Sequence, residues 1–454
     1  MSLLVRRAAV VNAPGGPQGT FDLAIEDGRI AAMEPELAPA AADTVLDAAG
    51  RLVVPGVVDA HVHLSGRFGR AIGYRMLVRA GVTCALDLAG DPGDMLRDLP
   101  GAGCGLTTGV LVPVVPGENV GGPDPSRAEI DALLDRSLAA GALGLKAIGG
   151  HYPITPAALD RVLAACADRG AHCAVHAGST ETGSDITGLE ELLEIAAGRP
   201  VHVAHVNSYC RGQIEDPVAE AARAVAALSA APAAWSESYL ALVNAADAAC
   251  RDGVPVSHVV QTCLRLGGYA QTEAGLLEAI AAGWALIHVE EADGIRFAAP
   301  DEGREAFAAA GTDIAVSFPV NPPAAALAVA LARGPAGFAV DALASDGGTL
   351  PRNTLLAQGL GLVAAGALSP PDLVHKLSAE PARRLGLPGK GRIEVGADAD
   401  LVVVDGGGPE TVIAGGRVAV AGGALLEPAG GTLLCTPAGA GAATAAGVPH
   451  RVPA

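Results

Sequence analysis

Two histidines one residue apart, His61 and His63, are the first sign of chemistry in this chain. They end an apolar run that begins after Pro55-Gly56 and passes through Val57-Val58-Asp59-Ala60. Side chains alternate along a β-strand, so both imidazoles would leave a buried strand on the same face. Two convergent imidazoles are suited to a divalent metal ion. The competing interpretation places one histidine in the core and the other at the end of the strand.

Further polar side chains stand at the ends of other apolar runs. In chain order they are Lys146, His176, His205 and Asp346. The first three follow one another at intervals of about 30 residues, the length of one βα unit of a barrel. Each would therefore come from the next strand around a ring, and all would meet the two histidines at one end. The spacing predicts a metal site.

Lys146 lies inside the apolar run 143–148. A lysine in a buried strand is unfavourable unless its charge is removed or paired. One hypothesis pairs it with Asp346 or Glu290. The other has the neutral amine capture carbon dioxide, giving a carbamate whose oxygens bridge two metal ions. Charge balance favours the carbamate. Two divalent ions carry four positive charges, and the carbamate, an aspartate and a bridging hydroxide together cancel three of them. The remaining positive charge would stabilise a developing oxyanion.

The elements that must position these residues alternate between apolar runs and Ala/Leu-rich helical patterns. Expected strands are 52–62, 82–88, 106–115, 143–148, 172–176, 201–206, 285–289 or 314–318, and 339–345. Helices such as 155–168 and 188–197 fall between them. Strands too apolar for one-sided burial indicate a parallel sheet, and eight βα units predict a (β/α)8 barrel with its site at the carboxyl ends of the strands. A doubly wound sheet is the alternative, but no GxGxxG turn follows the first strand.

Both ends of the chain are rich in short strands and Gly-containing turns. We therefore expect residues 1–54 and 385–430 to form one composite β-domain beside a barrel of residues 55–384. The Ala/Gly/Pro-rich segment 431–454 is expected to lack fixed structure. The long connection between His205 and Asp346, which includes 235–239, is expected to be largely helical and to form a lid or wall over the site.

Composition limits the partners of the chain. Of its 454 residues 50% are hydrophobic and 17% are charged, so a large core can form. The net charge of −19 argues against nucleic acid and membrane as partners. The 8 cysteines show no CxxC spacing and the first residues lack an apolar signal segment, so we expect a cytoplasmic protein. A homo-oligomer is compatible with this composition.

Together, these segments resemble the binuclear amidohydrolase superfamily, which includes dihydroorotases, hydantoinases and N-acyl-D-amino-acid deacylases. The similarity rests on Pro55-Gly56-Val57-Val58-Asp59 before His61-Val62-His63, on Lys146, and on Ala174-Val175-His176, Ala204-His205-Val206-Asn207-Ser208 and Ala344-Ser345-Asp346-Gly347. The stretches 377–387 and 391–401 also resemble the family's return into its small β-domain. The resemblance covers roughly residues 1–430. It implies a distorted TIM barrel with a composite β-sandwich domain.

The resemblance also implies a role for each residue. The implied metal ligands are His61, His63, Lys146, His176, His205 and Asp346. The first two histidines and Asp346 would hold the more buried ion, His176 and His205 the second, and carboxylated Lys146 would bridge both. Asp346 would carry a proton from the hydroxide to the leaving nitrogen. Two zinc ions suit this donor set, and manganese or iron would also fit. His172, His202 and His288 are interpreted as structural.

The substrate is less clearly indicated. Dihydroorotases carry an arginine two positions after the second histidine, where this chain has Ser65. Candidate substrate-binding residues are Arg67, His151, Tyr152, Asn207 and Arg352, with Ser208, Tyr209 and Arg211 as further candidates. His151 or Tyr152 would polarise the scissile carbonyl, and Arg352 would bind a carboxylate or pair on the surface.

The function favoured by these residues is metal-dependent hydrolysis of a non-terminal C–N bond in a cyclic amide, an N-acyl amino acid or a peptide-like amide. One alternative is a hydrolase of modified peptides, of the amidine or thiazoline type, in natural-product biosynthesis. Deamination of a heterocycle is another, but such relatives generally lack the bridging lysine. A non-catalytic assembly subunit is the alternative outside enzymes, and the complete set of ligands counts against it.

Overall fold

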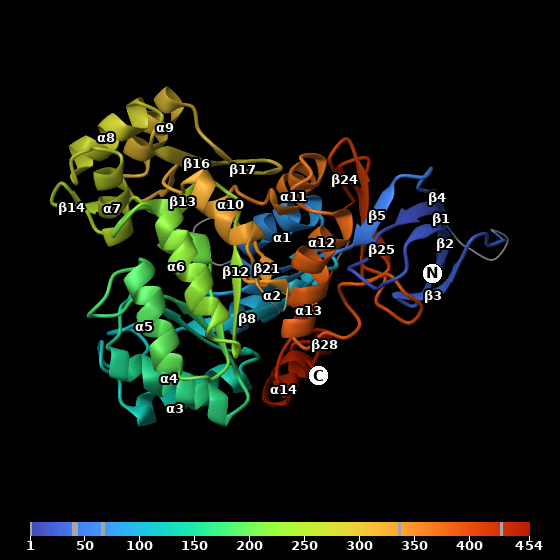
Figure 1. The fold of residues 1–454 in the computed structure, drawn as a ribbon, viewed down its shortest axis with the longest axis horizontal. Coiled ribbons are helices and arrows are strands. Elements are labelled where there is room, and N and C mark those ends of the chain that lie inside the picture. The colour runs from blue at the N-terminus through green and yellow to red at the C-terminus, as the bar shows by residue number, and fades with distance from the viewer. Residues whose placement is uncertain (1, 39–43, 65–68, 335–336, 427–429) are drawn as a thin grey trace.

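The computed structural model describes residues 2–38, 44–64, 69–334, 337–426 and 430–454. Its largest element is a curled parallel sheet with helices on the outside (Figure 1). Seven strands follow one another around it: β6 (Val57–His63), β7 (Val82–Asp87), β8 (Thr107–Pro113), β9 (Gly144–Ile148), β10 (His172–His176), β11 (Val201–Val203) and β12 (Ala234–Ser238). These strands are almost wholly buried and, except for β12, mostly apolar, as expected where both faces of a parallel sheet are covered.

A broken eighth strand closes this sheet into a barrel. Its first part, β21 (Ala342–Leu343), pairs in parallel with β12, and its second part, β22 (Gly347–Gly348), pairs in parallel with β6. One short segment thus contacts both edges of the sheet. The molecule is the predicted distorted (β/α)8 barrel, but the seventh strand is β12 and neither of the two expected segments.

Helices connect the strands along the outside of the barrel. In chain order they are α1 (Arg70–Arg79), α2 (Pro92–Ala102), α3 (Arg127–Ala139), α4 (Pro156–Asp168), α5 (Ile186–Ala196), α6 (Pro217–Ser229), α10 (Pro323–Leu331) and α11 (Leu355–Ala364), followed by the short α12 (Pro370–Val374) and α13 (Glu380–Arg384). Local sequence fixes several starts. Ser126 and Glu129 form a capping box on α3, and Thr155 and Asp185 accept hydrogen bonds from the first turns of α4 and α5.

A second sheet combines the two ends of the chain (Figure 1). It contains β1 (Ser2–Val10), β2 (Gly19–Glu26), β3 (Arg29–Glu34), β4 (Thr44–Asp47) and β5 (Leu52–Pro55), and also β23 (Leu401–Asp405), β24 (Gly408–Ala414), β25 (Arg417–Ala421) and β26 (Ala424–Leu425). The antiparallel pairing of β5 with β23 joins the two halves. The domain boundaries after residues 54 and 384 stay predictions.

An insertion separates β12 from its helix α10. It contains a four-stranded sheet of β13 (Asn244–Asp247), β18 (Ala315–Phe318), β16 (Leu286–Glu291) and β17 (Gly294–Phe297), the short hairpin strands β14 (Cys250–Arg251) and β15 (Val254–Pro255), and helices α7 (His258–Leu266), α8 (Glu273–Ala281) and α9 (Pro300–Ala309). The segments expected as barrel strands, 285–289 and 314–318, pair here instead. The insertion is therefore not simply helical. It has a hydrophobic core of its own, and it leaves the barrel from the carboxyl end of a strand, where active sites of this fold lie.

The expectation that residues 431–454 lack fixed structure is wrong. Strand β27 (Thr432–Leu434) pairs in parallel with the start of β8, and α14 (Ala440–Ala445) and β28 (His450–Arg451) follow it. Leu434 is fully buried among side chains of the barrel strands. The short apolar run in this segment is enough to cover the amino-terminal end of the barrel. In the described part of the chain, no helix is both long enough and apolar enough to cross a membrane.

Candidate metal centre

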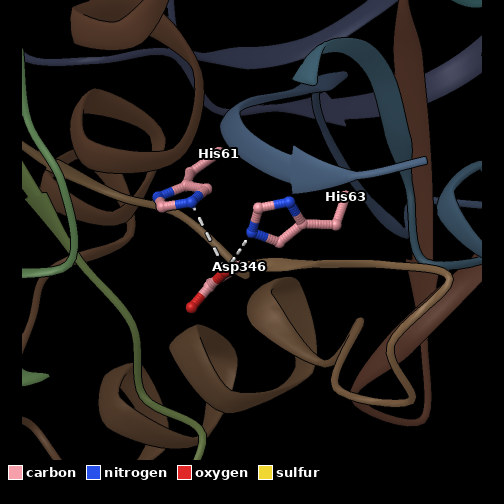
Figure 2. A group of neighbouring side chains, drawn as sticks. All are labelled: His61, His63 and Asp346. Atoms are coloured by element: carbon pink, nitrogen blue, oxygen red, sulfur yellow. Dashed lines mark ion pairs between the residues drawn. The ribbon is translucent and has the colours of Figure 1, made fainter. Parts of the chain in front are cut away.

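Three predicted ligands come together at the carboxyl end of the barrel. Asp346 Oδ1 lies 3.4 Å from Nε2 of His61 and 3.0 Å from Nε2 of His63. Figure 2 shows both imidazoles turned toward the carboxylate. One donor atom from each residue lies within 4.8 Å of the other two. This spacing and these donor types suit a divalent metal ion.

The break in the eighth strand places Asp346 at this point. Its φ is 50°, in the left-handed region that aspartate tolerates better than most residues. Its backbone N–H donates to the carbonyl of His61 at 2.9 Å, which continues the pairing with β6 across the break. The kink between β21 and β22 thus turns an aspartate toward the two histidines while the barrel stays closed.

Arg352 holds the other oxygen of the same carboxylate. Its Nη2 lies 2.6 Å from Asp346 Oδ2, and its Nη1 donates to the carbonyl of Val243 at 3.0 Å. Burial alone would raise the pKa of Asp346, but Arg352 and His61 hold that pKa well below its ordinary value. Arg352 is therefore buried and paired with Asp346, not paired on the surface, and its role in binding a substrate carboxylate stays a prediction.

Glu237, on β12, was not among the predicted site residues. It is fully buried, its Oε1 lies 2.6 Å from Nδ1 of His61, and the same oxygen accepts a hydrogen bond of 2.8 Å from the backbone N–H of His205. Burial raises the pKa of Glu237. A carboxylate behind a ligating histidine fixes its tautomer and orientation, so this contact leaves Nε2 of His61 facing Asp346. The interval of about 30 residues continues from His205 to Glu237, and this spacing was the signal that could have identified it.

His176 and His205 form a second pair at the ends of β10 and β11. Their ring centroids are 4.4 Å apart, and the His205 ring stacks 5.1 Å from that of His61. Ser184 Oγ lies 2.7 Å from Nε2 of His176, and Ser208 Oγ lies 2.7 Å from Nδ1 of His205. The other ring nitrogens, Nδ1 of His176 and Nε2 of His205, can therefore serve as metal ligands. Burial lowers the pKa of both rings, which favours the neutral form that binds metal ions.

Lys146 is buried on β9, beside Ala174 of β10, with 2% of its surface exposed. Burial lowers the pKa of its ammonium group, and the carboxylates of Glu237 and Asp346 oppose this shift. Across the described ranges, no aspartate or glutamate forms an ion pair with Lys146. Glu290, one of its two suggested partners, lies in the insertion on β16.

The other histidines make separate contacts. His172 Nε2 lies 3.2 Å from His202 Nδ1, and His202 stacks on Trp235 with ring centroids 3.8 Å apart. His202 Nε2 also lies 3.8 Å from Oε1 of Glu237. His288 belongs to the insertion, where its Nε2 lies 2.8 Å from Ser317 Oγ.

The predicted substrate-binding residues are distributed unevenly. His151 and Tyr152 are exposed, and the His151 ring lies 5.8 Å from that of His176. Asn207 is buried beside His205, where its Oδ1 accepts a hydrogen bond of 3.0 Å from the backbone N–H of Tyr239. Arg67 and Ser65 lie outside the described residues.

Comparison with known proteins agrees with this arrangement. The model of the amidohydrolase family matches residues 52–422, so the chain belongs to that family. A dihydroorotase of Pelotomaculum thermopropionicum (strain DSM 13744 / JCM 10971 / SI) is 28% identical over 442 residues, 89% of each chain. An N-acyl-D-aspartate deacylase of Alcaligenes xylosoxydans xylosoxydans is 27% identical over 230 residues, 42% of this chain and 46% of the deacylase. The molecule is thus a metal-dependent amidohydrolase.

Solved structures show the same fold. A D-aminoacylase superposes with a TM-score of 0.67 at 17% identity, over 95% of this chain and 99% of its own. A D-hydantoinase superposes with a TM-score of 0.60 at 17% identity, over 95% and 98%. An N-acyl-D-glutamate deacylase from Bordetella bronchiseptica, determined with zinc, superposes with a TM-score of 0.63 at 17% identity, over 92% and 96%.

Proposed function

We propose that this protein hydrolyses a non-terminal, amide-like C–N bond with two divalent metal ions. The observation that carries the proposal is the convergence of His61, His63 and Asp346 next to a second pair of buried histidines. The assembly of these residues also favours an enzyme over a non-catalytic subunit. Cyclic amides and N-acyl amino acids are the proposed substrates, in line with the names of the dihydroorotase and deacylase relatives.

The donor set fits a binuclear centre. His61, His63 and Asp346 would hold one ion, and His176 and His205 would hold the other. Lys146 would bridge both as a carbamate, because burial favours the neutral amine that reacts with carbon dioxide. When bound, two such ions supply Lewis acidity that polarises a carbonyl and lowers the pKa of water. Imidazole nitrogens and carboxylate oxygens suit zinc.

The side chains would then divide the remaining work. Asp346 is ionised and would accept a proton from the attacking water, then donate it to the leaving nitrogen. Arg352 would keep that carboxylate oriented through Oδ2. Glu237 would hold His61 and the backbone of His205 in place.

Lys146 gives the most direct test. The chain contains a second fully buried lysine, Lys376, whose Nζ donates to the carbonyl of Val340 at 2.7 Å. We expect two metal ions per chain and a carbamate carbon resonance after incubation with 13C-bicarbonate. Lys146→Met should remove the resonance, while Lys376→Met should keep it.

Activity adds a second readout. Lys146→Met should abolish amide hydrolysis, and Lys146→Ala should regain part of it when short-chain carboxylic acids are added. Metal-loaded protein without the carbamate resonance would contradict the bridge. Folded protein that binds no metal would contradict the whole catalytic scheme.

A further inference from the structure

Arg211 lies just beyond the second pair of histidines. After His205 the chain makes a short 3-10 turn, Val206–Tyr209, and Arg211 then reaches the connection that follows β12. Its Nε donates to Asn321 Oδ1 at 2.8 Å, and its Nη2 donates to the hydroxyl of Tyr239 at 3.0 Å. Because both connections leave carboxyl ends of barrel strands, the guanidinium is held on the catalytic side of the barrel.

Buried groups hold this guanidinium in place. Tyr239 is fully buried and Asn321 is 4% exposed. Nδ2 of Asn321 donates to the hydroxyl of Tyr239 at 3.2 Å and to the carbonyl of Ala241 at 3.1 Å. The Tyr239 ring lies 6.2 Å from that of His205. An arginine fixed in this way loses little conformational freedom when it binds a ligand.

The charge of Arg211 has no protein counter-ion in the part of the chain that the structure describes. Its two hydrogen-bond partners are neutral, and its Nη1 makes no hydrogen bond with a described residue. Arg352, whose guanidinium carbon lies 5.1 Å from the centroid of the Tyr239 ring, has its charge matched by Asp346. Guanidinium groups bind carboxylates strongly and with defined geometry.

We propose that Arg211 binds a free carboxylate of the substrate and so makes the enzyme selective for acidic amides, whether N-acyl amino acids or ring amides that carry a carboxylate. This inference rests on the proposed function. In the sequence, Ser65 stands where dihydroorotases have a carboxylate-binding arginine. Arg211 would supply the missing charge from a different connection of the barrel.

The test compares acidic substrates with neutral partners of the same shape. Dihydroorotate is compared with its carboxamide, and N-acetyl-D-methionine and N-acetyl-L-methionine with theirs. Arg211→Met should lower kcat/KM for the acid about 10- to 150-fold, mainly through KM, the loss expected for a charge-assisted hydrogen bond. It should change kcat/KM for the neutral partner less than about twofold, as expected where no such bond is lost. Arg211→Lys should restore part of the difference.

A matched control is Arg265→Met, which changes an exposed arginine on α7 and should leave both values unaltered. Metal content is measured for every variant. An equal loss on acid and neutral substrate in Arg211→Met would overturn the inference in favour of a structural role. Unchanged values on both substrates would also overturn it.

Binding separates this inference from the proposed function. If the wild-type protein hydrolyses none of these amides, the proposed function fails, and calorimetry with N-acetyl-D-methionine and its carboxamide still tests Arg211. We then expect the acid to bind at least about tenfold more tightly than the amide, with the preference lost in Arg211→Met. Equal affinity of the wild-type protein for acid and amide would overturn the inference.

Discussion

Glu237 contacts two of the proposed ligand residues through a single oxygen atom. One contact orients the ring of His61, and the other holds the backbone of His205. Groups that orient ligating histidines commonly account for 10- to 100-fold in metal affinity, and both histidines depend on Glu237 here. A buried carboxylate in this position therefore couples the two halves of the proposed centre.

Removal of Glu237 should weaken metal binding. Glu237→Ala is expected to lower the metal affinity about 10- to 100-fold, because it frees the His61 ring and the His205 backbone. Glu237→Gln should cost less, since its amide oxygen can accept the same bonds. Competition with a chelator measures the dissociation constants. The control is Glu220→Gln, because Glu220 is fully buried but accepts bonds from backbone N–H groups near Gly212. Equal metal affinity in wild type and Glu237→Ala would contradict this role.

Spacing along the chain predicted where the six ligand candidates would meet, because strand ends in a barrel share one rim. The sequence did not predict Glu237 as a site residue, because its strand, 234–238, reads Ala-Trp-Ser-Glu-Ser and is less apolar than 285–289 or 314–318. Those two segments do form strands, but they pair with each other. Apolar patterns identify a strand, whereas its sheet depends on pairings that only the folded chain specifies.

The eighth strand combines closure of the barrel with placement of a ligand. Gly348 has a φ of 82°, and a Cβ added there would lie 2.3 Å from the carbonyl oxygen of His63. The close approach of these two backbones is what positions His63 opposite Asp346. Sequence alone did not reveal this constraint, because the run 339–345 predicted one continuous strand that ends before Asp346.

Gly348→Ala should therefore damage both stability and metal binding. Gly366 is a matched control, because its φ is 72° but an added Cβ there would have nothing within 4 Å. Gly366→Ala should cost about 1–2 kcal/mol for its left-handed backbone alone. Gly348→Ala should cost more and should also lower metal affinity by displacing His63. Denaturant unfolding and chelator competition measure the two effects. Equal losses of stability in both variants, with metal affinity unchanged, would contradict this explanation.

At the scale of the whole molecule, the chain forms three structural units: the barrel, the insertion and the composite β-sheet. The barrel supplies the ligands, while the insertion and the composite β-sheet lie toward opposite ends of the molecule (Figure 1). The composite sheet could be predicted because both chain ends show short alternating strands. The order in the last residues could not, since the buried side chains of Leu433, Leu434 and Cys435 offset an Ala/Gly/Pro-rich composition by packing against the barrel.

The insertion has its own core, and a buried histidine makes its stability depend on pH. Burial, together with the nearby charge of Arg352, lowers the pKa of His288 to about 3. The unfolded value is about 6.5. As the pH falls below about 6.5, the unfolded chain binds a proton that the folded insertion excludes, so stability is lost progressively down to about pH 3. At pH 5 the loss from this residue is about 2 kcal/mol.

His288→Gln should reduce this pH dependence, because glutamine can bond Ser317 without titrating. Urea unfolding at pH 7 and pH 5, followed by Trp284 fluorescence in a Trp235→Phe background, isolates the insertion. Between pH 7 and pH 5 the free energy of unfolding of the wild-type protein should fall by about 2 kcal/mol more than that of His288→Gln. His258→Gln, at an exposed histidine of α7, should behave like the wild type. Identical pH dependence in His288→Gln and the wild type would contradict this explanation. It would show that folding does not shift the pKa of His288 and that the acid sensitivity of the insertion arises elsewhere.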